Sequence, residues 1–232
     1  MSLYLILNLA SISIPFIYSF EKRMRFIKWW KEVFSSIAIV AFLFIVWDIL
    51  FTAQGVWGFN ERYLIGLNIL NLPIEEWLFF ICIPYASVFT HYAIRHFLPG
   101  LVLSVLVTKI ITITLIIVLS IVISLHTDKA YTFLNYGLLL LVLIYSLLTK
   151  NQEIRSFYIS FLVILIPFFI VNGILTGSFI EEPVVWYNNI ENLGIRLGTV
   201  PVEDIGYAFV MLFSNIILIE KFKNRSIKYQ KK

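Results

Sequence analysis

The residues best suited to chemistry in this sequence are four carboxylic acids that occur as two adjacent pairs. Each pair ends a short pattern: residues 73–76 read Pro-Ile-Glu-Glu and residues 201–204 read Pro-Val-Glu-Asp. Two carboxyl groups held close together in a medium of low dielectric cannot both ionise, so one keeps its proton. Such a pair can protonate a weak base and take a proton back. The acids are Glu75, Glu76, Glu203 and Asp204.

An ordinary helix start accounts for part of this pattern. Proline suits the first helical position, and acids suit the first turn because the helix dipole is positive there. The duplication favours function, since carboxyl groups at the edge of hydrocarbon are costly and are usually functional. The surrounding sequence repeats at the same offset of 128 residues: Phe59-Asn60 matches Tyr187-Asn188, Gly66 matches Gly194, and Pro73 matches Pro201.

The elements that must position these acids are membrane helices. Of the 232 residues, 60% are hydrophobic and only 14% are charged, against about 25% charged in a soluble domain. The apolar runs are continuous and do not alternate, which predicts an all-α integral membrane protein. The net charge of +4 comes from lysines and arginines in short loops. We interpret it as a topology signal, and expect no nucleic-acid partner.

The apolar runs predict seven transmembrane helices, each near the about 20 residues that cross the hydrocarbon layer. The repeat then predicts two three-helix halves, residues 1–98 and 129–232, joined by a connector helix within residues 99–128. The second half includes a basic tail. The expected spans are Leu3–Phe20, Phe34–Phe51, Ile74–Tyr92, Leu101–Leu125, Phe133–Thr149, Ser156–Ile174 and Val202–Ile219.

The basic residues predict the orientation of these spans. The first, third and fifth loops and the tail carry 14 of the 18 lysines and arginines. Basic loops favour the cytoplasm, so we expect the N-terminus outside and the C-terminus inside a cell (cytoplasmic) membrane. The two halves would then run parallel, related by an axis along the membrane normal. The four carboxyl groups would converge at this axis, near the outer leaflet.

Other side chains in the spans are candidates for supporting roles. Asp48 and Asn172 could hydrogen-bond a catalytic acid or simply pack between helices. His91 falls at the predicted inner end of its span, and we expect it at the membrane interface. The aromatic rings nearest the acids could stabilise a carbocation; these are Trp57, Trp77, Trp186 and Tyr207.

Several classes of protein lack their signature here. There is no Gly-x-Gly-x-x-Gly motif and no Walker A loop. The sequence has no His or Cys ligand cluster and no aspartate-rich motif for magnesium, so we expect no metal and no cofactor. A retinal protein would need a lysine in Val202–Ile219, which has none. A proton-coupled carrier of a lipophilic solute stays an alternative, because paired acids at a repeat interface also serve proton coupling.

The duplicated acid motifs resemble the paired signatures of the membrane-integral, non-flavin lycopene cyclases. The similar stretches are Pro73–Trp77 and Pro201–Tyr207, and the blocks Trp57–Asn60 and Pro183–Asn188 also look like family sequence. The chain is similar to the fused form, in which one polypeptide carries both halves. Asp204 stands where the first half has Glu76, which leaves a carboxyl group in place.

This resemblance implies an isomerisation without net redox change. The linear end group of lycopene is protonated at its terminal double bond, the cation closes a six-membered ring, and loss of a ring proton gives the β-ring of γ-carotene or β-carotene. The substrate would come from the lipid phase through an apolar lateral entry, and water would have to be excluded. A cyclase of another carotenoid end group stays an alternative, and other carotenoid enzymes are candidate partners.

The resemblance also suggests roles for individual residues. We expect Glu75 and Glu203 to be the leading proton donor and acceptor candidates, with Glu76 and Asp204 as partners that adjust their proton affinity. The order of donor and acceptor stays open. The expected substrate-binding residues are Trp57, Asn60, Trp77, Trp186, Asn188, Tyr207, Asp48 and Asn172.

Overall fold

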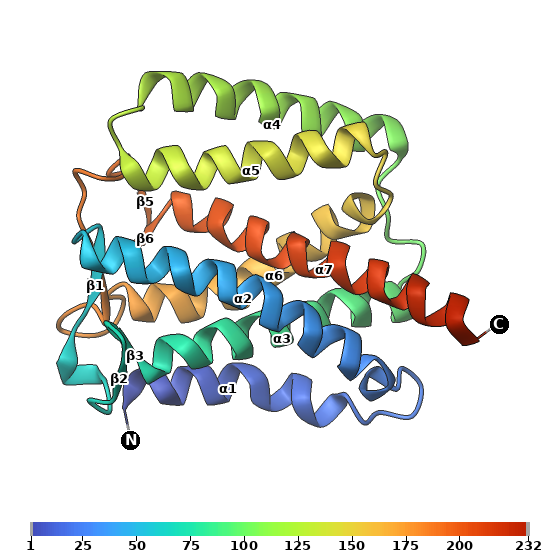
Figure 1. Cartoon of the computed structure of the whole chain (residues 1–232), viewed down its shortest axis with the longest axis horizontal. Coiled ribbons are helices and arrows are strands. Elements are labelled where there is room, and N and C mark those ends of the chain that lie inside the picture. The colour runs from blue at the N-terminus through green and yellow to red at the C-terminus, as the bar shows by residue number, and fades with distance from the viewer. Residues whose placement is uncertain (1, 231–232) are drawn as a thin grey trace.

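Seven helices run side by side in the computed structural model, which describes residues 2–230 (Figure 1). Six are long and apolar enough to cross a membrane, which supports a multi-pass membrane protein. Lys231 and Lys232, which the sequence assigns to the basic tail, lie outside the described residues. The helices are α1 (Leu3–Tyr18), α2 (Trp30–Ala53), α3 (Ile74–Phe97), α4 (Val105–Leu125), α5 (Ala130–Leu148), α6 (Glu153–Leu175) and α7 (Glu203–Gln230).

Helix α1 is shorter than the expected span Leu3–Phe20. It has 16 residues and is therefore about 24 Å long, so its crossing of the membrane stays a prediction. The backbone N–H of Leu5 donates to Ser2 Oγ (3.1 Å), which fixes where the helix begins. Ser104 caps α4 in the same way, and for this reason α4 begins at Val105 rather than at Leu101.

Short strands that the sequence did not predict lie at one end of the bundle, which we call the acidic end. Strand β1 (Trp57–Phe59) pairs antiparallel with β4 (Val185–Tyr187), with Gly58 opposite Trp186. This ladder joins the two halves of the chain. Two further ladders lie within single halves. In the first half, the 3₁₀-helix η2 (Glu61–Tyr63) is followed by β2 (Asn68–Ile69), which pairs with β3 (Leu72–Pro73). In the second half, β5 (Arg196–Leu197) pairs with β6 (Val200–Pro201).

These hairpins explain part of the sequence repeat. Gly66 and Gly194 precede the two hairpins with φ of 87° and 70°, a backbone region that favours glycine. Pro73 and Pro201 end the hairpins at matching register positions, opposite Asn68 and Arg196. The repeated Gly and Pro therefore shape the turn that leads into α3 and α7.

The helices of the two halves pack in a similar way. Helix α1 lies along α3 and α5 lies along α7, while α2 contacts both α3 and α7. Helix α6 packs on α3 and α7, and α4 lies along α5 on the edge of the bundle (Figure 1). The N-terminal end of α1 lies at the acidic end, and the C-terminal end of α7 lies at the opposite end, which we call the basic end (Figure 1).

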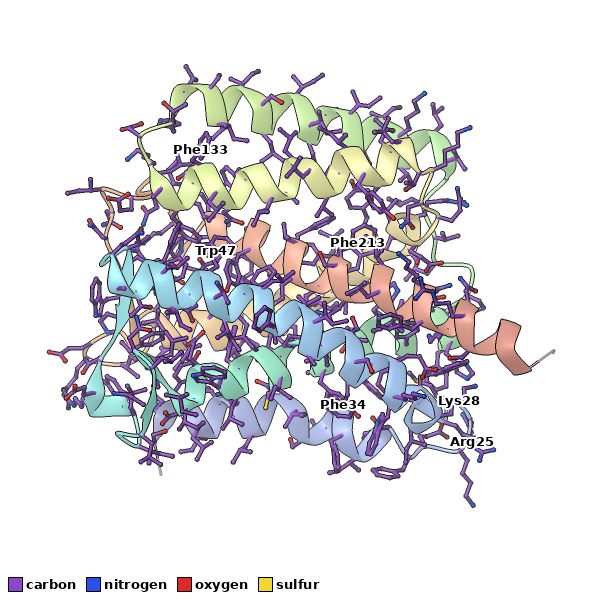
Figure 2. All side chains as sticks on the ribbon, in the orientation of Figure 1. Arg25, Lys28, Phe34, Trp47, Phe133 and Phe213 are labelled. Atoms are coloured by element: carbon purple, nitrogen blue, oxygen red, sulfur yellow. The ribbon has the colours of Figure 1, made fainter. Side chains whose placement is uncertain are left out.

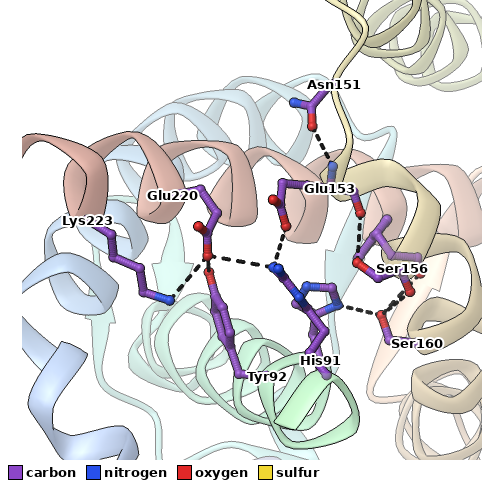
Figure 3. A network of polar contacts seen from close by, with 10 residues as sticks. His91, Tyr92, Asn151, Glu153, Ser156, Ser160, Glu220 and Lys223 are labelled. Atoms are coloured by element: carbon purple, nitrogen blue, oxygen red, sulfur yellow. Dashed lines mark hydrogen bonds and ion pairs between the residues drawn. The ribbon is translucent and has the colours of Figure 1, made fainter. Parts of the chain in front are cut away.

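The basic end carries Arg25 and Lys28, in and beside the 3₁₀-helix η1 (Phe26–Trp29; Figure 2). Nearby, a charged network joins α3 of the first half to α6 and α7 of the second (Figure 3). Tyr92 Oη and Lys223 Nζ both donate to Glu220, at 2.6 and 3.2 Å. This network ties the two halves together at the end opposite the acids.

The expected position of His91 at the membrane interface stays a prediction. Its side chain is fully buried between helices, and its Nδ1 lies 2.5 Å from Ser160 Oγ of α6 (Figure 3). The ring also contacts Tyr92 and Phe157 edge-on. The sequence alone could not show that α6 covers this face of α3.

Candidate active site

An apolar cavity of about 480 Å³ lies between α1, α3, α6 and α7. This volume is within the range of about 300–1,000 Å³ that is usual for small-molecule sites. Among residues 2–230, the acids on its wall are Asp48, Glu76 and Asp204, all at the acidic end, and most of the remaining wall is hydrocarbon or aromatic. Apolar side chains that extend the cavity away from the acids include Phe79, Ile83, Ile164, Phe168, Met211 and Leu212.

The first half contributes a pair of carboxyl groups. Asp48 of α2 and Glu76 of α3 are both buried and are close enough to interact. Tyr4 Oη of α1 donates to Glu76 Oε2 (2.5 Å). Trp57 Nε1 and Thr52 Oγ1 both donate to Asp48 Oδ1, the latter at 3.2 Å, whereas Asp48 Oδ2 has no partner among residues 2–230. We call Tyr4, Asp48 and Glu76 the first cluster.

The second half contributes one carboxyl group with three donors. Tyr131 Oη of α5 donates to Asp204 Oδ1 (2.6 Å). Tyr187 Oη of β4 and Asn172 Nδ2 of α6 donate to Asp204 Oδ2, at 3.0 and 3.4 Å. Removal from water, together with the nearby Asp204 charge, raises the pKa of Tyr187 well above its ordinary value, so this phenol stays a donor. We call Tyr131, Asn172 and Asp204 the second cluster.

Glu75 and Glu203 do not reach the cavity. Glu75 Oε1 accepts from Ser2 Oγ and from the backbone N–H of Ile65, both at 2.7 Å. Glu203 Oε1 accepts from Thr132 Oγ1 and the backbone N–H of Leu193, also at 2.7 Å. Glu75 therefore connects the loop before α3 to the start of α1. Glu203 connects the loop before α7 to α5 in the same way.

The expected convergence of four carboxyl groups is thus replaced by a different set. Adjacent residues on a helix point about 100° apart, and the side chain of Glu75 turns toward Ser2 and Ile65 while that of Glu76 turns toward the cavity. Glu76 and Asp204 line it, and Asp48, expected only in a supporting role, joins them. Of the aromatic candidates, Trp57 and Tyr207 also line the cavity.

Four expected substrate-binding residues lie elsewhere. Asn60 and Asn188 are in loops, where each side chain accepts from a backbone N–H two residues on, at 3.1 Å. Trp77 Nε1 faces the carbonyl of Ile69. Trp186 covers Gly58 so closely that a Cβ added there would lie 2.3 Å from the indole ring. These residues shape the acidic end and are not on the cavity wall.

Sequence reasoning missed a second repeated motif, which supplies the tyrosines of both clusters. Tyr4 and Asn8 of α1 correspond to Tyr131 and Asn135 of α5, since each tyrosine donates to the second acid of its half. Asn8 and Asn135 each donate to the backbone carbonyl of the first acid, at 2.8 and 2.5 Å. A Tyr-x-x-x-Asn signal was present, but its offset is 127 rather than 128, so a repeat search without gaps passes over it.

Fold and site together define the class of this protein: an all-α, multi-pass membrane protein whose apolar interior cavity carries acids at one end. The lycopene cyclase family model matches residues 1–94 and 128–222. The chain therefore belongs to the lycopene cyclase family, which confirms the resemblance and implies an enzyme that acts on a carotenoid. Comparisons with curated proteins and with solved structures found no significant match.

Proposed function

We propose that this protein is a lycopene β-cyclase that closes the linear end groups of lycopene to β-rings. The observation that carries the proposal is the placement of three carboxyl groups at one end of a long apolar cavity. The reaction needs a strong acid, a base and dry walls around a carbocation, because a water molecule would trap the cation as an alcohol. A membrane interior supplies the apolar substrate directly.

The two clusters suggest a division of labour. Two neighbouring carboxyl groups in an apolar site hold one proton between them, so the pair Asp48 and Glu76 suits the proton donor. Asp204 accepts three hydrogen bonds, which favour the ionised form, so it suits the base. This assignment differs from the one that the resemblance suggested, in which Glu75 and Glu203 were the leading candidates for proton donor and acceptor.

The proposed reaction balances without a redox partner. The donor pair delivers one proton to the terminal double bond, and the resulting tertiary cation is attacked by a neighbouring double bond to close the ring. Asp204 then removes one ring proton, so the end group is isomerised with no net gain or loss. The faces of Trp57 and Tyr207 line the same end of the cavity and would stabilise the positive charge.

We also propose the arrangement of the chain in the membrane. Residues 1–98 and 129–232 would form parallel halves joined by a connector, with the acidic end facing outward in the cytoplasmic membrane of the cell. The antiparallel pairing of β1 with β4 around Gly58 and Trp186 supports this, because strands related by a two-fold axis meet in this way. The matching hydrogen bonds of Glu75 and Glu203 support it as well.

Pigment chromatography of lycopene-producing cells tests the function. Expression of the chain should convert lycopene to a one-ring or two-ring product, while the double variant Glu76→Gln/Asp204→Asn should accumulate in the membrane and leave lycopene unchanged. If the unsubstituted chain is present in the membrane and lycopene persists, the proposal is wrong. A carrier or a cyclase of another carotenoid would then be the account to pursue.

A further inference from the structure

The cavity reaches the lipid-facing surface of the bundle at one place, between α1 and α6. Four residues line the cavity and are also exposed on the outside: Ala10 and Ile14 on α1, and Pro167 and Ile170 on α6. Ile14 is 65% exposed and Ile170 is 61% exposed. All four are apolar, so the opening faces hydrocarbon rather than water. We call these four residues the seam.

The cavity is too short for a whole C40 carotenoid. Its wall on α3 runs from Glu76 to Thr90, which is about 21 Å at 1.5 Å per residue. Its wall on α1 runs from Tyr4 to Pro15, which is about 16 Å. An extended carotenoid is about as long as the hydrocarbon layer is thick, about 30 Å. With one end group at the acids, the other end must leave the protein.

The place that corresponds to the seam by the sequence repeat differs from it in two ways. Asp48 and Thr52 of α2 correspond to Asn172 of α6 and Thr176, the residue directly after α6, since each threonine follows its partner by four residues near the helix end. The residue before Asp48 is Trp47, whereas the residue before Asn172 is the smaller Val171.

Trp47 of α2 stands at the position that Val171, a residue of the cavity wall, holds in α6. It is 7% exposed and packs on Tyr131 and Tyr207, with ring centroids 6.4 and 5.0 Å away. Helix α4 then covers the outer side of α5, which is the counterpart of α1 (Figure 1). Among residues 2–230, the larger Trp47 and the covering helix α4 therefore distinguish this place from the seam.

We propose that the seam is the entry for the substrate and that, during turnover, the distal half of the carotenoid stays in the lipid between α1 and α6. This rests on the proposed function and adds its substrate rule. The protein reads one end group at a time and does not contact the other end. It should accept any carotenoid with one acyclic end, and a two-ring product should require release and re-entry of the molecule.

Cysteine labelling in proteoliposomes tests the entry. In Ala10→Cys, N-pyrenylmaleimide dissolved in the bilayer should react with the new thiol, and lycopene in the membrane should slow that reaction at least about five-fold. The control is Leu9→Cys, because Leu9 is 46% exposed and does not line the cavity. Its labelling should be insensitive to lycopene. The native Cys82 is buried and sets the background.

Turnover measured on the same samples separates the two proposals. The pyrenyl adduct at Ala10→Cys should lower cyclisation at least ten-fold, and the adduct at Leu9→Cys should not. Equal effects at both positions, with active unlabelled protein, would overturn the entry but not the cyclase. No product from the unlabelled, unsubstituted chain would instead overturn the proposed function.

A second substrate tests where the distal end lies. A carotenoid with one acyclic end and one closed ring should show kcat/KM within about two-fold of that for lycopene, because only the acyclic end enters. A fall of more than ten-fold would mean that the protein encloses both ends, and the proposal would be wrong.

Discussion

The two halves of the molecule present the same tyrosine and nearly the same acid to the cavity, but they differ in one neighbour. In the first cluster the neighbour of Glu76 is the carboxyl group of Asp48, whereas in the second cluster the neighbour of Asp204 is the amide of Asn172. A carboxyl neighbour can share an acidic proton, whereas an amide has none to share and here donates a hydrogen bond to Asp204. In the proposed mechanism, this exchange of a carboxyl group for an amide distinguishes the proton donor from the base.

Loss of the base should have the largest effect. Asp204→Asn keeps the shape of the side chain and removes its ability to take a proton, so we expect kcat to fall by about 10²–10⁴-fold, the usual contribution of a positioned acid or base. Pigment conversion by purified protein in liposomes would measure the loss. Asp128→Asn, the same change at an exposed residue outside the cavity, should be silent. Full activity of Asp204→Asn would refute the assigned base.

Removing the difference between the clusters should come next. Asp48→Asn gives the first cluster the same neighbour as the second and leaves Glu76 without a partner that shares its proton. We expect kcat to fall by about 100-fold, with less effect on KM because the cavity walls are unchanged. If Asp48→Asn were as active as the unsubstituted chain, the comparison between the clusters would have no chemical meaning.

The first acids of the two motifs should show the smallest catalytic effect. Glu75→Gln and Glu203→Gln keep an oxygen that can accept from Ile65 or Leu193. We expect kcat within about ten-fold of normal and a loss of stability of about 1–3 kcal/mol, because the amide group satisfies the buried hydrogen-bond donors less well than the carboxyl group does. Thermal unfolding in detergent would measure it. Complete inactivity with unchanged stability would restore these acids to the reaction.

How far the sequence predicted the molecule can be judged from particular residues. The continuous apolar runs predicted the helices of an all-α membrane protein, and family membership confirmed the resemblance. The motif Pro-x-acid-acid located both functional helix starts. It could not say which acid of each pair faces inward, because that depends on the angle at which α3 and α7 leave their hairpins.

Other parts of the site could not be predicted for reasons of packing. The sequence left open whether Asp48 and Asn172 would hydrogen-bond an acid or only pack between helices, and the packing of α2 and α6 places them beside Glu76 and Asp204. The matched residues Asn60 and Asn188 suggested substrate contacts. Each side chain instead accepts a hydrogen bond from the backbone of its own loop, so a repeated turn is enough to explain why both halves carry an asparagine there. The β1–β4 ladder depends on contact between the two halves, which no local pattern shows.

Isotope exchange tests the division of labour between the clusters most directly. Variants would be incubated with lycopene in D₂O, and the recovered lycopene analysed by mass spectrometry. Asp204→Asn retains the donor pair, so reversible protonation should place deuterium at the terminal double bond while little ring forms. Glu76→Gln lacks a complete donor pair and should place none. Exchange by Glu76→Gln, or its absence in Asp204→Asn, would contradict the account.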